Sequence, residues 1–229
     1  MKKYIFIISS VISIWLTSYL SILPLNWNSQ ADISNLYSTS ITPAWFTFSI
    51  WIIIYLSWIF LWIYIMLKNI KIKNIKILLL ITAQIISALW LFPWHYNYIW
   101  ISLIIMMILL SILWYLSINR EKNVIFQNIS DLFFWWILVA SIANAHIFLV
   151  YSNIYSEPVI LWVISLIIWW LINYIILKKY NSLITSIVFI WALIWIISKQ
   201  TEIFIIFTSY IILIILTLII VKNKIIKKI

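Results

Sequence analysis

The side chains in this sequence that are best suited to chemistry are aromatic rings and amides at helical spacing. Trp51 and Tyr55 are four residues apart, and Trp136, Ala140 and Asn144 repeat every four residues. Residues four apart share one face of a helix, so each set forms a stripe. Aromatic clusters with a few amides suit a flat, apolar ligand. The alternative for the aromatic pair is packing or an interfacial belt, and for Asn144 a bond to a neighbouring helix.

Other chemistries are poorly supported by the sequence. The chain has no cysteine, which excludes disulfides, thiolate metal sites and a cysteine nucleophile. His95, in a predicted turn, and His146 have no second ligand-type residue at metal spacing, so we predict no metal site and expect each to be hydrogen-bonded. There is no Ser-His-Asp set and no nucleotide-binding or nucleic-acid motif. We therefore predict no catalytic residues and no required cofactor, while enzymatic activity stays open.

The composition shows which elements must position these side chains. The chain of 229 residues is 66% hydrophobic and 9% charged, whereas a soluble domain has about 45–50% apolar and about 25% charged residues. A membrane helix needs about 20 mostly apolar residues. We predict an all-α, polytopic membrane bundle of about eight transmembrane helices. Its spans are expected at residues 4–25, 42–67, 77–93, 97–118, 131–152, 159–177, 183–198 and 203–221.

The charges divide unequally between the two sides of this arrangement. Eight spans place Lys199 alone on one side, with Asp32, Glu157 and Glu202, and the other 14 of the 15 basic residues on the opposite side. Short cytoplasmic loops collect Lys and Arg, so we expect both termini to be cytoplasmic. The net charge of +10 then reflects topology and contact with membrane lipid, not binding of nucleic acid.

Ionisable side chains are missing from the predicted spans. No Asp, Glu, Lys or Arg lies inside one, and Asp131 stands at the edge of the fifth. Charged groups at bilayer depth usually mark ion pathways or active sites. Their absence argues against an ion-coupled carrier and against an intramembrane protease or metalloenzyme.

Three segments carry a resemblance to a known family. The first is PAWFTFSIWIIIY at Pro43–Tyr55, the second is WILVASIAN at Trp136–Asn144, and the third contributes Gln84, Trp90 and Phe92. Together they resemble the second, fifth and third helices of the translocator protein family, whose bacterial members are called tryptophan-rich sensory proteins (TspO/MBR).

The resemblance implies an organisation in two parts. Residues 1–152 are similar to the family's five-helix core, and residues 153–229 would be a three-helix extension. Leu91–Tyr96 and Trp191–Trp195 resemble the longer bacterial branch, which has such an extension. Family members are commonly dimeric, so a homodimer is an expected assembly, and the implied location is the bacterial inner cell membrane.

The resemblance also implies a ligand and a pocket. Family members bind porphyrins and other tetrapyrroles, which implies binding, sensing or translocating a planar hydrophobic small molecule, as a receptor or in transport. The loop at residues 26–41 would be the lid of the pocket. The implied ligand-binding residues are Trp51, Tyr55, Trp136, Ala140, Ala143 and Asn144. The alternatives are a facilitative small-solute transporter and a membrane assembly subunit with no ligand.

The chain contains 17 Trp and no Gly, although glycine averages about 7% of residues and is enriched in membrane helices. An AT-rich composition predicts few tryptophans, because the tryptophan codon carries two guanines. Some bacterial lineages read UGA as glycine, so we hypothesise that several tryptophans are glycine in the protein that the cell makes. The longer bacterial branch typically has glycine at the positions of Trp27, Trp45, Trp100, Trp135 and Trp195.

Overall fold

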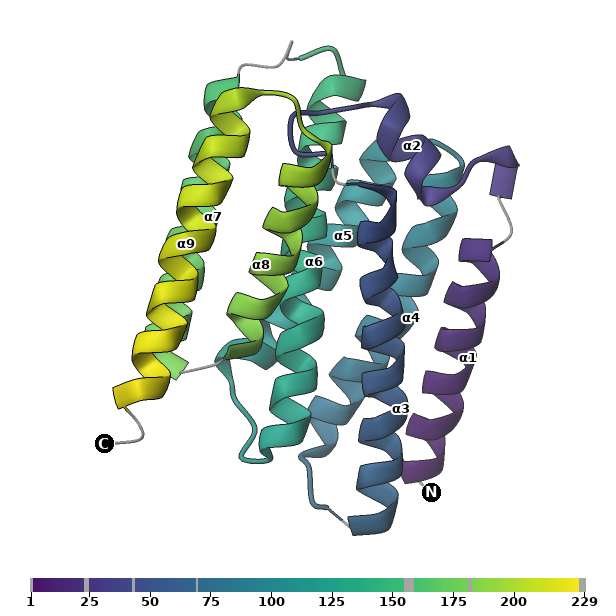
Figure 1. Cartoon of the computed structure of the whole chain (residues 1–229). Helices are drawn as coiled ribbons and strands as arrows, with labels where there is room; N and C mark the ends of the chain where they lie inside the picture. The colour runs from purple at the N-terminus through teal and green to yellow at the C-terminus, as the bar shows by residue number, and fades with distance from the viewer. Residues whose placement is uncertain are drawn as a thin grey trace.

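The structure, a computed structural model, describes residues 2–22, 25–42, 44–68, 70–154, 159–180 and 183–226, so Pro43 and Glu157 lie outside the described residues. Each predicted span corresponds to a helix (Figure 1), and the described ranges contain no strand. The long helices are α1 (Lys2–Ile22), α3 (Ile50–Lys68), α4 (Asn74–His95), α5 (Ile99–Ile118), α6 (Val124–Tyr151), α7 (Val159–Tyr180), α8 (Leu183–Lys199) and α9 (Ile203–Ile226). The short ones are η1 (Leu25–Trp27), α2 (Gln30–Leu36) and η2 (Trp45–Ser49). The predicted all-α class is confirmed.

The helices are long and apolar enough for a multi-pass membrane protein. Among the described residues, five helices are long and apolar enough to cross a membrane. The number rises to six if the bent pair of α1 and the segment Leu25–Leu36 is one span. Two further apolar stretches, Trp162–Ile175 and Ile184–Lys199, are shorter. A helix satisfies its own backbone hydrogen bonds, which lipid cannot do. Helical geometry is therefore what these apolar sequences require.

Two hydrophobic clusters fill the bundle. The larger is built mainly from α1, α3, α4, α5 and α6. The smaller comes from α7, α8 and α9 and includes Ile41 of the first loop. α6 contacts α3, α5 and α8, and so it connects the two clusters. The division of the chain at residue 152 stays a prediction.

Buried polar side chains join neighbouring helices. The Ser10 hydroxyl donates to Gln84 Oε1 at 3.0 Å between α1 and α4, and Ser186 Oγ donates to Asn173 Oδ1 at 3.2 Å between α8 and α7. Such bonds contribute about 0.6 kcal/mol each on average in a membrane bundle. Gln84 thus bonds a neighbouring helix.

Two positions differ from the sequence-based expectation. Asn123 Oδ1 accepts a hydrogen bond from the Phe126 amide at 2.9 Å and so caps α6, which begins at Val124 rather than near residue 131. Asp131 therefore lies about two turns inside the helix and not at its edge. His95 lies in the last turn of α4 and not in the following turn, with its Nδ1 2.7 Å from the Leu91 carbonyl oxygen.

The buried Asp131 carboxylate is the centre of an ionic network where α5 meets α6. Its side chain is 1% exposed, and its Oδ2 lies 3.0 Å from Arg120 Nη2. Gln127 Nε2 donates to Asp131 Oδ1 at 2.9 Å. Lys76 of α4 lies 3.6 Å from Glu121 and donates to the Asn119 carbonyl. The network fixes the start of α6 against α4 and α5.

The ends of the chain and the first loop lie at opposite ends of the bundle. α1 begins and α9 ends at one end, whereas α2 and the last turn of α8 lie at the other (Figure 1). There, Lys199 Nζ donates to Asn35 Oδ1 at 2.5 Å.

Candidate ligand-binding site

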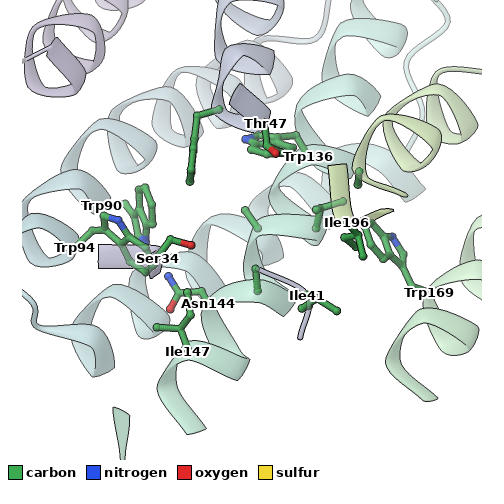
Figure 2. A pocket seen from close by; sticks show the side chains of 15 residues that line it. Ser34, Ile41, Thr47, Trp90, Trp94, Trp136, Asn144, Ile147, Trp169 and Ile196 are labelled. Carbon is green, nitrogen blue, oxygen red and sulfur yellow. The ribbon is translucent and has the colours of Figure 1, made fainter. Parts of the chain in front are cut away.

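A narrow cavity lies beneath the first loop, between α4, α6, α7 and α8. Its open space is about 60 Å³. Figure 2 shows Trp90 and Trp94 on one side of this space, with Ile196 and Trp169 on the opposite side. The lining residues are Ser34, Ile41, Thr47, Phe48, Trp90, Trp94, Trp136, Val139, Ala140, Ala143, Asn144, Ile147, Trp169, Ala192 and Ile196.

The stripe on α6 forms the floor of the cavity. Four of the six predicted ligand-binding residues are brought together here: Trp136, Ala140, Ala143 and Asn144. The i, i+4 spacing sets this arrangement, and the two alanines leave the space open because their side chains are short.

The other two predicted residues line a different space. Trp51 and Tyr55 of α3 border a second hollow of about 470 Å³, with ring centroids 5.7 Å apart. The Trp51 ring also lies 6.3 Å from that of Trp136. Phe48 borders both spaces, so the predicted residues divide between two adjoining hollows.

Several polar atoms around the cavity have no hydrogen-bond partner among the described residues. Asn144 Nδ2 donates to Ser102 Oγ at 2.8 Å, whereas Asn144 Oδ1 and the indole nitrogens of Trp90, Trp136 and Trp169 are buried without one. Buried indole N–H groups usually find an acceptor. The lining thus offers donors and one acceptor within an apolar wall. Asn144 is compatible with both predicted roles. Its Nδ2 bonds the neighbouring helix α5, and its unpaired Oδ1 is available to a ligand.

The loop at residues 26–41, predicted to be a lid, covers this end of the bundle and contains α2. Ser29 Oγ accepts from the Asp32 amide at 3.2 Å, and the Ser29 amide donates to Asp32 Oδ2 at 2.8 Å. These bonds cap α2. Hydrogen bonding of the Asp32 carboxylate by the Ser29 side chain, and second by the Ser29 backbone, holds the pKa of Asp32 below its usual 3.8. Trp94 Nε1 donates to the Gln30 carbonyl at 3.2 Å, which ties α2 to α4.

Sequence reasoning missed the wall that α7 and α8 contribute. Trp169, Ala192 and Ile196 line the cavity, and the only signal was the resemblance of the segment Trp191–Trp195 to the longer branch. Conversely, Phe92 was noted for its resemblance but is 39% exposed.

The second histidine joins two helices. His146 of α6 stacks on Trp162 of α7 with centroids 3.4 Å apart, and its Nε2 lies 3.3 Å from Ser165 Oγ. Among the described residues there is no group of three His, Cys, Asp or Glu side chains that could hold a metal ion.

Two suspected tryptophans have surroundings that suit glycine better. Trp27 has φ 64° and is 93% exposed, and a positive φ is an outlier for a bulky residue. The Trp195 ring centroid lies 3.5 Å from that of Phe46, closer than the usual 4.5–7 Å or so for aromatic pairs.

Comparison with known proteins identifies the family. The family model for TSPO-like proteins matches residues 3–222, which include all but the first residue of α1, all of α2 to α8 and most of α9. No curated protein and no solved structure matches the chain. The chain is a multi-pass membrane protein that belongs to the TSPO-like protein family.

Proposed function

We propose that this protein binds a planar, apolar small molecule of the tetrapyrrole class beneath the first loop. The observation that carries the proposal is the lining of the cavity, in which unpaired indole N–H groups and Asn144 Oδ1 are set in an apolar wall. A tetrapyrrole presents an apolar face to such a wall, and its ring and edge substituents supply hydrogen-bond partners. Sensing and translocation would both use this site.

The size of the cavity bears on how the ligand is held. Drug-sized ligands occupy pockets of about 300–1,000 Å³, whereas the narrow cavity has about 60 Å³ and the adjoining hollow about 470 Å³. We infer that the ligand occupies the hollow bordered by Trp51 and Tyr55 and reaches across Phe48 toward Trp136 and Asn144. Rotation of the Phe48 side chain would merge the two spaces.

The first prediction concerns the polar contacts. Trp136→Phe keeps the aromatic ring but removes the N–H donor, and Asn144→Ala removes the unpaired acceptor. A hydrogen bond is worth about 0.5–1.5 kcal/mol, so we expect each variant to bind protoporphyrin about 2- to 13-fold more weakly. Titrating detergent-solubilised protein and following quenching of tryptophan fluorescence measures this.

Trp15→Phe is the matched control, because Trp15 is exposed on α1 and lies outside both spaces. Its affinity should equal that of the unaltered protein. If the unaltered protein does not bind protoporphyrin, the proposal is wrong. Saturable solute flux in proteoliposomes without any effect of porphyrin would favour the small-solute transporter instead.

We further propose that both termini are cytoplasmic and the first loop faces the opposite side of the cell membrane. Support comes from the basic residues, of which Lys199 alone is expected on the side of the loop. Because the chain has no cysteine, single cysteines can report the topology. We expect a membrane-impermeant maleimide applied to intact cells to label Ser38→Cys but not Lys71→Cys, both exposed positions. Labelling of Lys71→Cys alone would show that the protein has the opposite orientation.

A further inference from the structure

α8 faces the cavity although it belongs to the predicted extension. Ala192 and Ile196 are four residues apart on α8 and both line the cavity, with 2% and 3% of their surface exposed. Ile196 lies across the space from Trp90 (Figure 2). α8 also contacts α6, which carries the predicted stripe. The site is thus bounded by helices from both parts of the chain.

The end of α8 is fastened to the first loop. Gln200 Nε2 donates to the Thr42 carbonyl at 2.9 Å and to the Thr39 carbonyl at 3.4 Å. These two threonines already form a turn, in which the Thr42 amide donates to the Thr39 carbonyl at 2.9 Å. One amide side chain of the extension therefore holds the turn that ends the loop.

Ile41 lies inside this turn and contacts both the cavity and the hydrophobic cluster of α7, α8 and α9. It lines the cavity, and it is 6% exposed within the hydrophobic cluster of α7, α8 and α9. Opening the loop would pull Ile41 out of that cluster and break the bonds from Gln200. The extension thereby stabilises the closed position of the loop.

We propose that α8 is a ligand-binding element of this protein. Ala192 and Ile196 form the wall that limits the width of an apolar ligand, and Gln200 holds the loop closed over it. The inference rests on the proposed function, because a wall selects a ligand only if the cavity takes one. None of the three residues is a tryptophan, so the assignment is independent of which tryptophans are glycine.

Enlarging the wall residue tests the first half of the proposal. Ala192→Val and Ala192→Phe should weaken protoporphyrin binding in that order, with Phe at least about tenfold weaker because it overfills the space. Ile194→Phe is the control, since Ile194 is 44% exposed on the same helix. The graded series keeps the test usable if the larger substitution impairs folding.

The outcomes separate this inference from the proposed function. If the unaltered protein binds and Trp136→Phe weakens binding, but both Ala192 variants bind normally, α8 is not part of the site and the proposed function stands. If the unaltered protein does not bind, the proposed function is wrong and the wall has no ligand to select.

The fastening of the loop is tested without a ligand. Gln200→Ala should increase amide hydrogen exchange in residues 39–42, whereas Glu202→Ala, an exposed neighbour, should not. We expect the same variant to release protoporphyrin about fivefold faster, as for loss of about one hydrogen bond. Unchanged exchange in Gln200→Ala would overturn the second half of the proposal.

Discussion

Arg120→Met is expected to lower the free energy of unfolding by about 3 kcal/mol, since breaking a buried ion pair costs about 3–5 kcal/mol and this guanidinium is partly exposed. The change removes the guanidinium that lies 3.0 Å from the Asp131 carboxylate, whose side chain is 1% exposed, while the neutral donor Gln127 stays in place. Reversible unfolding by SDS in mixed micelles, followed by circular dichroism, gives the free energy. α6 begins beside this pair, so we also expect weaker ligand binding.

Lys122→Met provides the matched control, because it removes a positive charge from an exposed residue of the same loop. Its unfolding free energy should change by no more than about 0.5 kcal/mol. The double variant Arg120→Met/Asp131→Asn should recover part of the loss, since it also removes the buried negative charge. Equal stability of Arg120→Met and the unaltered protein would show that the network does not hold the start of α6.

The second large effect is expected in the covalent structure itself. Peptide mass spectrometry of the protein isolated from its own cells should read glycine at Trp27, Trp45, Trp100, Trp135 and Trp195. At Trp27 the reason is the backbone, because the positive φ costs a residue with a side chain about 1–2 kcal/mol. At Trp195 the reason is the short distance to Phe46.

Glycine at these positions would also enlarge the site. Trp45 borders the second hollow, and the Trp195 ring lies 3.5 Å from the ring of Phe46, which belongs to η2 as Trp45 does. We expect a chain made with glycine at the five positions to bind protoporphyrin at least about tenfold more tightly than the all-tryptophan chain, given the cost of overpacking. Trp15→Gly is a control for removing an exposed indole. A gene that encodes all 17 tryptophans by UGG would disprove the hypothesis.

The helices and one face of the site could be predicted from the sequence because both depend on local periodicity. Long apolar runs specify membrane helices, and the i, i+4 spacing of Trp136, Ala140 and Asn144 specifies one face of α6. The predicted start of α6 was wrong, because the first two turns of this helix carry polar residues. Asn123 caps the backbone of the first turn, and Asp131 pairs with Arg120, a contact that only the tertiary structure reveals.

The rest of the site depends on contacts between distant segments. Ala192 and Ile196 form an ordinary apolar pair on α8, and nothing in their spacing points to α6 or to the first loop. Gln200 likewise follows a helix end, where a polar residue is expected. Trp51 and Tyr55, which the sequence predicts for the same pocket, border the adjoining hollow instead. Phe48 borders both spaces, and only the tertiary structure shows this division.

The bond between Gln200 and Thr42 joins residues 158 positions apart, and this separation has a consequence for biogenesis. Ribosomes add about 5–20 residues per second, so Thr42 waits on the order of ten seconds for its partner to be made. During that interval the early helices can insert into the membrane while the first loop is not yet held by Gln200.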